Sequence, residues 1–389
     1  MKNLKFKAAP YLILTLILSL IFACSNSEPE IVFISSDSDG QQEEQSTDDD
    51  SGVEEIAGVV RDISSFELVS EMGVGWNLGN SFDVEDRDKT LWNNPLPSQE
   101  IIDQVSELGF KTLRIPVTWD YHLGETAPYV LEEEYLDEVQ KIVNYGLLND
   151  MFVILDTHHE ESWAGPVPEN FDEVSPRMSS LWTQIAERFK NYGDKLIFEP
   201  LNEPRVIGSP NEWSGGTAAE RTILNDLHRV CQEAIRATGG NNTNRHLLIS
   251  TYAASTVPSA MDDLVIPNND SNVIISLHAY FPFLFALEGQ ESWGTESDRE
   301  DLRQEFDRIR NKWIVEEQRP IILGEWGAVV QNSLPERLDY AEFYVTEALE
   351  RDLLPIVWDD GGNFILLNRF NLFWPNLQVA ETIIEAANN

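Results

Sequence analysis

The sequence predicts a single α/β domain, a (β/α)8 TIM barrel in which eight parallel strands alternate with helices. Eight short apolar runs alternate with longer segments of helical period between residue 65 and the C-terminal end, and this alternation indicates a parallel sheet. The number of units and the length that they occupy are typical of a closed barrel. A doubly wound open sheet is the alternative, but no glycine-rich phosphate loop follows the first run.

Each predicted strand is a short apolar run, as expected for strands that are buried on both faces. In chain order, the runs cover residues 74–78, 112–117, 152–156, 196–200, 246–250, 273–279, 320–324 and 354–358. The segments between them carry apolar residues at helical spacing. The predicted helices cover residues 98–108, 132–145, 176–192, 218–237, 298–316 and 335–350.

The first 24 residues have the features of a bacterial lipoprotein signal. Lysines at positions 2, 5 and 7 precede an apolar run over residues 11–22, and Cys24 comes directly after Ala23. An apolar run of this length is too short to cross a membrane, which takes about 20 residues. We therefore expect a secreted chain whose Cys24 carries a lipid and anchors it at the bacterial cell envelope, at the outer membrane or the cell surface. A simple cleaved signal is the alternative.

Residues 25–60 are predicted to form an acidic, disordered tether between this signal and the barrel domain, which we place at residues 61–389. Residues 37–50 contain no apolar side chain and no base. Low hydrophobicity and a high density of like charges prevent such a segment from collapsing. The tether is expected to hold the barrel away from the membrane.

The charge balance restricts the partners of the chain. It has 27 basic and 67 acidic residues, a formal net charge of −40. Such a surface repels the phosphates of nucleic acids, so no nucleic-acid partner is expected, whereas a neutral polysaccharide meets no such penalty. Cys231 lies in a predicted helix and is expected to be a small buried residue. No exposed apolar stripe is recognisable, which favours a monomer.

Polar and aromatic residues gather where the apolar runs stop. In a barrel of this kind, the chemistry lies at the carboxyl ends of the strands. A purely structural barrel has no reason to place such a collection there, so we expect an active site. Its candidate residues are Asn77, Arg114, His158, His159, Asn202, Glu203, His278, Tyr280, Glu325 and Trp358.

Glu203 and Glu325 follow the fourth and seventh runs and are expected to face each other across the barrel. Glycoside hydrolysis needs such a pair, because one carboxyl group protonates the leaving oxygen while the other attacks the sugar or activates water. A separation of about 5–5.5 Å predicts retention of configuration, and one of about 6.5–9.5 Å predicts inversion. Arg114 is placed to keep Glu325 ionised, and the charge of Glu325 is expected to keep Glu203 protonated.

His278 and Tyr280 are two residues apart, so on a strand they point to the same face. Tyr280 is then placed to hydrogen-bond Glu325, and His278 to orient Glu203.

Trp358 offers a flat face for a pyranose ring, and His158 and Asn202 are placed to bind its hydroxyl groups. His159 is equally compatible with a packing role. Trp213 is expected to be a core or loop residue, as tryptophans outside the strand ends usually are.

These motifs resemble glycoside hydrolase family 5, and most closely its subfamily 4, over about residues 65–385. The motifs are Gly75-Trp-Asn-Leu-Gly-Asn80, Arg114-Ile-Pro-Val117, His158-His159, Phe198-Glu-Pro-Leu-Asn-Glu-Pro-Arg205, His278-Ala-Tyr280, Gly324-Glu-Trp-Gly327 and Trp358-Asp-Asp-Gly361. The resemblance implies a retaining endo-β-1,4-glucanase without metal or cofactor, with Glu203 as general acid/base and Glu325 as nucleophile. It places the eight signature active-site positions of the family at Arg114, His158, Asn202, Glu203, His278, Tyr280, Glu325 and Trp358.

The substrates implied by the resemblance are cellulose-type glucans, xyloglucan and mixed-linkage β-glucan, cut at internal bonds by double displacement. Two features differ from the family pattern and bear on this choice. Residues 281–285 are bulkier and more apolar than expected, and Asp360 stands where an asparagine is more usual. In addition, the sequence predicts Pro200 within the fourth strand, where its missing amide donor weakens the ladder.

Three alternatives accompany this prediction. The first is an endo-β-1,4-mannanase on the same scaffold, and the second is a surface lipoprotein that binds glycans without cutting them. The third is a metal-dependent hydrolase that uses His158, His159 and His278. Adjacent residues of a strand point to opposite faces, so the pair His158 and His159 argues against the third.

Overall fold

The computed structural model describes residues 53–89 and 92–389. The predicted signal peptide, its lipid-bearing Cys24 and residues 25–52 of the predicted tether lie outside the described residues. The described part of the chain therefore consists almost entirely of the predicted barrel domain.

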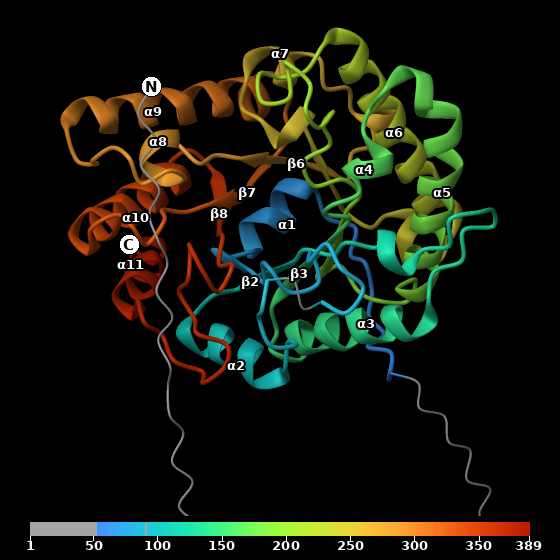
Figure 1. Ribbon diagram of the computed structural model, residues 1–389, viewed down its shortest axis with the longest axis horizontal. Helices are drawn as coiled ribbons and strands as arrows, with labels where there is room; N and C mark the ends of the chain where they lie inside the picture. Colours follow the sequence, from blue (N-terminus) through green and yellow to red (C-terminus); the bar gives the residue numbers. More distant parts are fainter. Residues whose placement is uncertain (1–52, 90–91) are drawn as a thin grey trace, which may run out of the picture. The chain divides into compact units, whose positions relative to one another are not determined.

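Eight parallel strands close into a barrel in which each strand pairs with the next in the chain and β8 pairs with β1 (Figure 1). The predicted fold class is thus confirmed, and every predicted strand corresponds to an observed one. The strands are β1 (Gly75–Asn77), β2 (Thr112–Ile115), β3 (Phe152–Asp156), β4 (Leu196–Glu199), β5 (Leu247–Ser250), β6 (Val273–His278), β7 (Ile321–Trp326) and β8 (Leu353–Val357).

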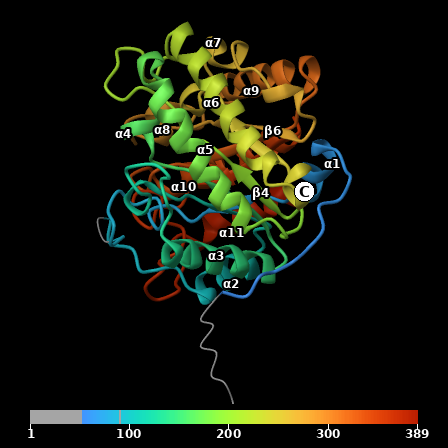
Figure 2. The same ribbon diagram turned by 90° about the vertical axis from the view of Figure 1, so that its right-hand side faces the viewer.

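Helices surround the barrel, and α3, α5 and α6 are seen side by side in Figure 2. Thr217 caps α6 and Thr295 caps α9 through capping boxes with the third helical residue of each. The helices are α1 (Ser65–Glu71), α2 (Gln99–Leu108), α3 (Glu133–Leu148), α4 (Glu161–Ala164), α5 (Phe171–Arg188), α6 (Ala218–Ala237), α7 (Pro258–Asp262), α8 (Phe283–Ala286), α9 (Glu296–Arg310), α10 (Leu334–Leu349) and α11 (Leu377–Ala387).

Most element boundaries differ from the prediction by a few residues, and three of the differences have a clear cause or consequence. The helix predicted to begin at Pro176 begins five residues earlier, because Phe171 and Val174 extend its buried side and the proline occupies the second turn. Strand β4 ends at Glu199, so Pro200 lies beyond the ladder and weakens no strand pairing. The helix predicted over 298–316 is α9, followed by a π-helical turn over Asn311–Glu316.

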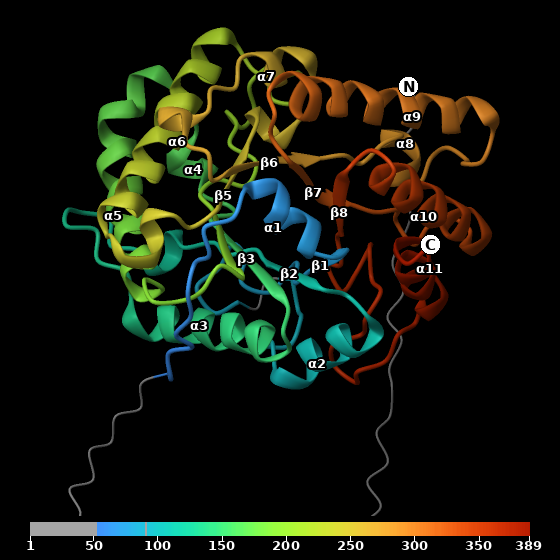
Figure 3. The same ribbon diagram turned by 180° about the vertical axis from the view of Figure 1, so that it is seen from behind.

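The amino-terminal end of the barrel interior is apolar and is covered by α1 (Figure 3). Leu68 of α1 is fully buried and packs against side chains that the strands direct inward. Those inward side chains are Phe152, Ile154, Ile197, Leu248, Ile274, Ile322, Leu354 and Ile356. Aliphatic residues from successive strands thus fill the barrel as layers of a core.

The carboxyl end of the interior is polar instead. Two residues further along β3, β4 and β6, the same inward face carries Asp156, Glu199 and Ser276. All three are completely buried. The barrel therefore changes from an apolar floor to a charged layer within one pleat of each strand.

Strand β7 contains one extra residue at its carboxyl end. Leu323 pairs with Leu277, but Glu325 pairs with the very next residue of β6, His278. The pairing with β8 shows the same shift between Leu323 and Trp326. Such a bulge inserts one unpaired residue and re-aims the side chains after it. Because of it, Glu325 points into the barrel, where strict alternation from Ile322 would have pointed it outward.

Cys231 is buried within α6 and is a free cysteine, as predicted. None of the helices in the described part of the chain combines the length and apolar composition that crossing a membrane takes.

Leu68→Ala is expected to lower the free energy of unfolding by about 2–5 kcal/mol, because it leaves a cavity between α1 and the barrel floor. Phe66→Ala is a matched control on the same helix. Phe66 is 40% exposed, so its truncation is expected to cost about 0.5 kcal/mol or less. Denaturant titrations followed by tryptophan fluorescence measure both. Equal losses would show that α1 does not seal the barrel.

Candidate active site

One guanidinium organises the charged layer at the carboxyl end of the barrel. Arg114 of β2 is fully buried, and its Nε donates to Glu199 Oε2 at 2.6 Å. Its Nη2 lies 2.9 Å from Asp156 Oδ2, and its Nη1 lies 3.0 Å from Glu325 Oε1. Burial opposes the charge on Arg114, but these three carboxylates raise the pKa of the guanidinium well above its usual range. The sequence did not single out Asp156 and Glu199 as members of the site.

Two amide side chains fix this guanidinium further. Arg114 Nη1 donates to Asn77 Oδ1 at 3.0 Å, and Nη2 donates to Asn202 Oδ1 at 2.7 Å. The Asn77 amide donates in turn to the carbonyl of Gly324, 2.9 Å away, at the bulge of β7. Asn77 therefore links the guanidinium to the strand that carries Glu325.

Glu325 receives a hydrogen bond on each oxygen. Arg114 donates to Oε1, and the Tyr280 hydroxyl donates to Oε2 at 3.0 Å. Both donors are buried or lie in the cleft wall, and both favour the ionised carboxylate. Both contacts are ones that the sequence predicts.

Glu203 lies beyond the end of β4, and its Oε1 is 2.7 Å from Nδ1 of His278. The same ring nitrogen is 3.6 Å from Glu325 Oε2. One oxygen of Glu203, one of Glu325 and a ring nitrogen of His278 all lie within 4.8 Å of one another. Strands β4 and β7 are on opposite sides of the barrel, so the two carboxyl groups face each other across its mouth.

A cleft of about 620 Å³ opens over these groups. Trp358 forms part of its wall and stacks on His158, with ring centroids 5.8 Å apart and an interplanar angle of 9°. Gly79 backs the indole, because a Cβ at this position would lie 2.6 Å from Trp358 Cζ2. The residues that line the cleft include Asn80, Asp83, His158, His159, Asn202, Glu203, Trp213, His278, Tyr280, Phe281, Phe283, Leu287, Glu325, Trp358 and Phe364.

His158 and His159 both line the cleft, which corrects the prediction that they point to opposite faces. They lie beyond the end of β3, so the alternation of a strand does not apply to them. Together with Asp83, they form a group whose donor atoms lie within 4.8 Å of one another. The ring nitrogens of His158 are already engaged, however, Nδ1 with Asp156 and Nε2 with the Asn202 amide. This geometry favours a substrate-binding role over a metal ligand.

The sequence and the fold of this chain were compared with those of known proteins. Residues 70–363 match the family model described as cellulase, glycosyl hydrolase family 5. The chain belongs to glycosyl hydrolase family 5. It is 42% identical to endoglucanase B of Clostridium cellulovorans over 84% of this chain and 77% of that protein.

Solved members of family 5 have the same fold. ZgEngAGH5_4, solved in complex with a cellotriose, superposes with a TM-score of 0.83 at 48% identity, over 84% of this chain and all of that one. A broad-specificity endoglucanase of subfamily 4 from Clostridium acetobutylicum superposes with a TM-score of 0.81 at 41% identity, over 83% of this chain and all of that one.

In this family 5 site, Glu203 is the carboxyl group that holds a proton near neutral pH. Burial raises the pKa of Glu203 to about 7, the charge of Glu161 adds to the rise, and Arg205 opposes it. The sequence predicts that Glu325 keeps Glu203 protonated. Burial and Glu161 are instead the main causes.

Burial also raises the pKa of Glu325, but the charges of His278 and Arg114 and the hydrogen bond from Tyr280 oppose the rise. The two carboxyl groups thus differ in how strongly their environment favours the charged form. Glu325, with donors on both oxygens, is the one held as a carboxylate.

Arg205 joins Glu203 to a second group of acids that sequence reasoning missed. Its Nη1 donates to Glu161 Oε1 at 2.5 Å, its Nε donates to Glu212 Oε1 at 3.2 Å, and Nη1 lies 3.5 Å from Glu203 Oε2. Its guanidinium also covers the ring of Trp213, 4.6 Å from the centroid. Trp213 is 62% exposed and lines the cleft, so it is not a core residue, but it does lie in a loop, the other place that was predicted for it.

Glu161→Gln is expected to move the alkaline limb of the activity profile to lower pH. A general acid works only while protonated, so with Glu203 in that role activity falls as pH rises through its pKa of about 7. Removing the negative charge of Glu161 lowers the pKa of Glu203. Arg205 then has one acid fewer to neutralise, so more of its positive charge acts on Glu203. We expect a shift of about 1 pH unit in kcat/KM.

Glu169→Gln is the control for the Glu161 experiment, because it removes the same charge from an exposed position. Its profile is expected to match that of the native enzyme. A Glu161→Gln variant that loses activity at every pH without moving the limb would show that Glu161 only supports the local structure.

Proposed function

We propose that this chain is a retaining endo-β-1,4-glucanase with Glu203 as general acid/base and Glu325 as nucleophile. The observation that carries the proposal is that one carboxyl oxygen of Glu203 and one of Glu325 lie within 4.8 Å of each other at the mouth of the barrel. A retaining mechanism places them about 5–5.5 Å apart, whereas an inverting mechanism needs about 6.5–9.5 Å to admit a water molecule.

The first step forms a glycosyl-enzyme. A Glu325 oxygen attacks the anomeric carbon as the bond from that carbon to the leaving oxygen breaks, and Glu203 gives its proton to the leaving oxygen. Arg114 and Tyr280 hold the attacking carboxylate in place and ionised. His278 holds the carboxyl group of Glu203 by its Oε1.

In the second step, Glu203 works as a base. It is now a carboxylate and takes a proton from a water molecule, whose oxygen attacks the anomeric carbon and releases Glu325. The two inversions leave the product with its original configuration. Burial raises the pKa of Glu203 to about 7. With this pKa, Glu203 can donate a proton in the first step and accept one in the second near neutral pH.

The cleft suits a neutral β-1,4-glucan chain. Trp358, Phe364 and Trp213 offer aromatic faces along it, and such faces pack well against sugar rings. Two solved relatives support a glucan substrate: one is a broad-specificity endoglucanase, and another was solved in complex with cellotriose. We place cellulose-type glucans, xyloglucan and mixed-linkage β-glucan among the substrates.

Glu325→Ala is expected to abolish release of reducing ends from carboxymethyl-cellulose, xyloglucan and mixed-linkage glucan. Glu203→Ala is expected to lower the rate about 10²–10⁴-fold, and azide is expected to restore turnover of an aryl β-glucoside by attacking the glycosyl-enzyme. NMR of the azide product should show the β configuration. Glu381→Ala, at an exposed position of α11, is the control and is expected to keep full activity.

The substrate panel also separates the alternatives. Activity on mannan with none on the glucans would keep the two glutamates and change the substrate to a β-mannan. No activity on any polysaccharide, together with retained binding, would favour a surface protein that binds glycans without cutting them. An α-configured azide product would contradict the retaining mechanism.

The position of the enzyme in the cell is a separate part of the proposal and rests on the first 24 residues alone. The native chain is expected to fractionate with membranes and to incorporate labelled palmitate, because Cys24 becomes the lipid-bearing residue. Cys24→Ser is expected to lose both properties. Cys231→Ala is the matched control, since Cys231 is buried in α6 and is unavailable to a lipid-transfer enzyme. Unchanged labelling of Cys24→Ser would contradict the anchor.

A further inference from the structure

Arg337 of α10 is a buried arginine whose guanidinium has no acceptor among the residues that the structure describes. The residue is 5% exposed. Its backbone amide bonds to the Ser333 carbonyl within the helix, but its side chain makes no hydrogen bond and no ion pair with residues 53–89 or 92–389. Burial lowers the pKa of Arg337, with no carboxylate acting against it.

The other buried arginines of the described chain all have acceptors, although the Nε of Arg369 has none. Arg114 has three carboxylates, and Arg245 donates to four backbone carbonyls and to Asn242. Arg369 donates to two backbone carbonyls and to Ser81. Arg337 differs from these three arginines because none of its side-chain nitrogens has an acceptor in the described residues.

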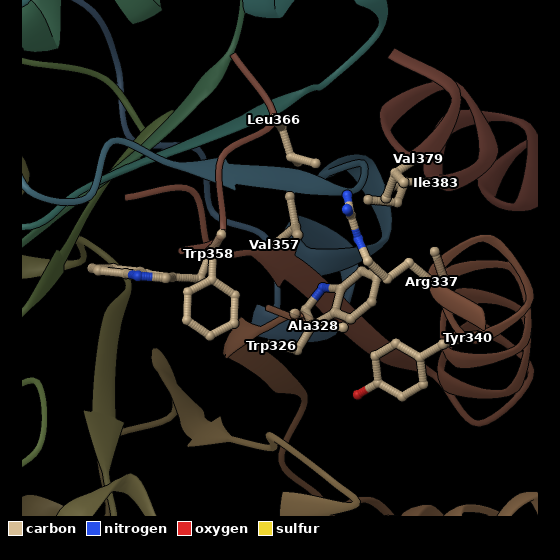
Figure 4. Close-up of a pocket in the computed structure, with 12 residues that line it drawn as sticks. Trp326, Ala328, Arg337, Tyr340, Val357, Trp358, Leu366, Val379 and Ile383 are labelled. Atoms are coloured by element: carbon tan, nitrogen blue, oxygen red, sulfur yellow. The ribbon is translucent and has the colours of Figure 1, made fainter. Parts of the chain in front are cut away.

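The Arg337 side chain lies against a cavity of about 20 Å³ between β7, β8, α10 and α11. Figure 4 shows it extending from its helix to lie between the Trp326 indole and the Val379 and Ile383 side chains. Trp326 is 1% exposed, and its Nε1 is a buried donor without a partner in the described residues. Two unpartnered donors from different elements thus line one small cavity.

The rest of the cavity wall is mostly apolar. Its other residues are Gly327, Ala328, Tyr340, Ala341, Val357, Trp358, Phe364, Leu366, Val379 and Ile383. The Tyr340 hydroxyl is already used, because it donates to the carbonyl of Phe281. An uncompensated charge in such surroundings is costly.

The acidic residues of α10 do not compensate Arg337. Glu336 bonds to Ser333 at the start of the helix. Asp339 bonds to Arg299 and to Trp293, and Glu347 pairs with Arg303 and Arg351. The described part of the protein supplies no counter-charge, and the guanidinium nitrogens of Arg337 are not among its fully buried unpartnered atoms, so they are open to an anion from solution.

We propose that this cavity is a binding site for a single halide ion, held by the Arg337 guanidinium and the Trp326 Nε1–H. The volume accommodates one atom-sized occupant, since a water molecule alone takes about 10–15 Å³ on this measure. Polyatomic anions such as sulfate are too large for it. Donors on two sides with an apolar remainder suit a monatomic anion, which needs no acceptor in return.

The halide site is distinct from the catalytic site and does not depend on the proposed function. Trp326 comes directly after Glu325 on β7, and the two side chains point to opposite faces of the strand. Trp358 and Phe364 line both the cavity and the cleft. The ion would therefore support the outer side of the aromatic wall of the cleft.

Crystals of the native protein grown or soaked in sodium bromide test the proposal directly. We expect an anomalous bromine peak within about 3.5 Å of both the Arg337 guanidinium and Trp326 Nε1. Refinement of this position as water in bromide, with no anomalous signal, would overturn the proposal. This measurement requires no variant to fold.

Thermal unfolding in solution tests the same site without a crystal. At a halide concentration about ten times its Kd, the native chain is expected to unfold about 2–4 °C higher in sodium chloride or bromide than in sodium gluconate of equal ionic strength. Arg337→Met is expected to lose this difference. In gluconate it should unfold at the same temperature as the native chain or higher, because it buries no uncompensated charge.

Arg310→Met is the control for the thermal experiment. It removes the same charge from the exposed end of α9 and is expected to keep the full halide effect. Trp326→Phe, which removes only the second donor, is expected to weaken it. A halide effect of equal size in the native chain and in Arg337→Met would overturn the proposal, as would its absence from the native chain.

Discussion

The positive charge of Arg114 allows three carboxylates to be buried together at the mouth of this barrel. Three carboxylates, from β3, β4 and β7, converge on one guanidinium that is closed off from solvent. Each would be costly to bury alone, and removing the shared cation would leave uncompensated negative charge in the interior. The position of Glu325 depends on this arrangement, because its Oε1 is one of the oxygens that the guanidinium holds. The catalytic proposal therefore rests on an ion cluster centred on a residue buried beneath the cleft.

The same cluster separates the roles of the two glutamates. Glu325 belongs to it and receives two donors that favour the carboxylate. Glu203 lies outside it, and its neighbours Arg205 and Glu161 largely neutralise each other. Burial then dominates at Glu203 and holds its proton near neutral pH. In the proposed mechanism, this difference in surroundings assigns two chemically identical side chains to opposite tasks.

The sequence predicted the barrel and most of the site because both depend on local patterns. Short apolar runs identify strands that are buried on both faces, and the polar residues just after them fall at one rim by topology alone. The tether and signal stay predictions. Asp156 and Glu199 were missed because an inward-facing acid on a strand is visible only once Arg114 is seen to lie between them. The exposure of Trp213 in the cleft and the lack of a partner for Arg337 were not predicted for a related reason, since both are properties of the folded chain.

The bulge at Gly324 has a consequence for the direction of the side chains beyond it. The side chains of a strand alternate between two sides, and the extra residue shifts this alternation by one. As a result, Glu325 faces the barrel interior and Trp326 faces the helices. A glycine suits the inserted position, because a Cβ there would lie 3.1 Å from the His278 ring. If the strand alternated regularly through this residue, the destinations of its two successors would be exchanged, with the indole entering the cleft and the carboxylate facing the helices. The polar end of the barrel and the cavity behind it thus depend on the same bulge.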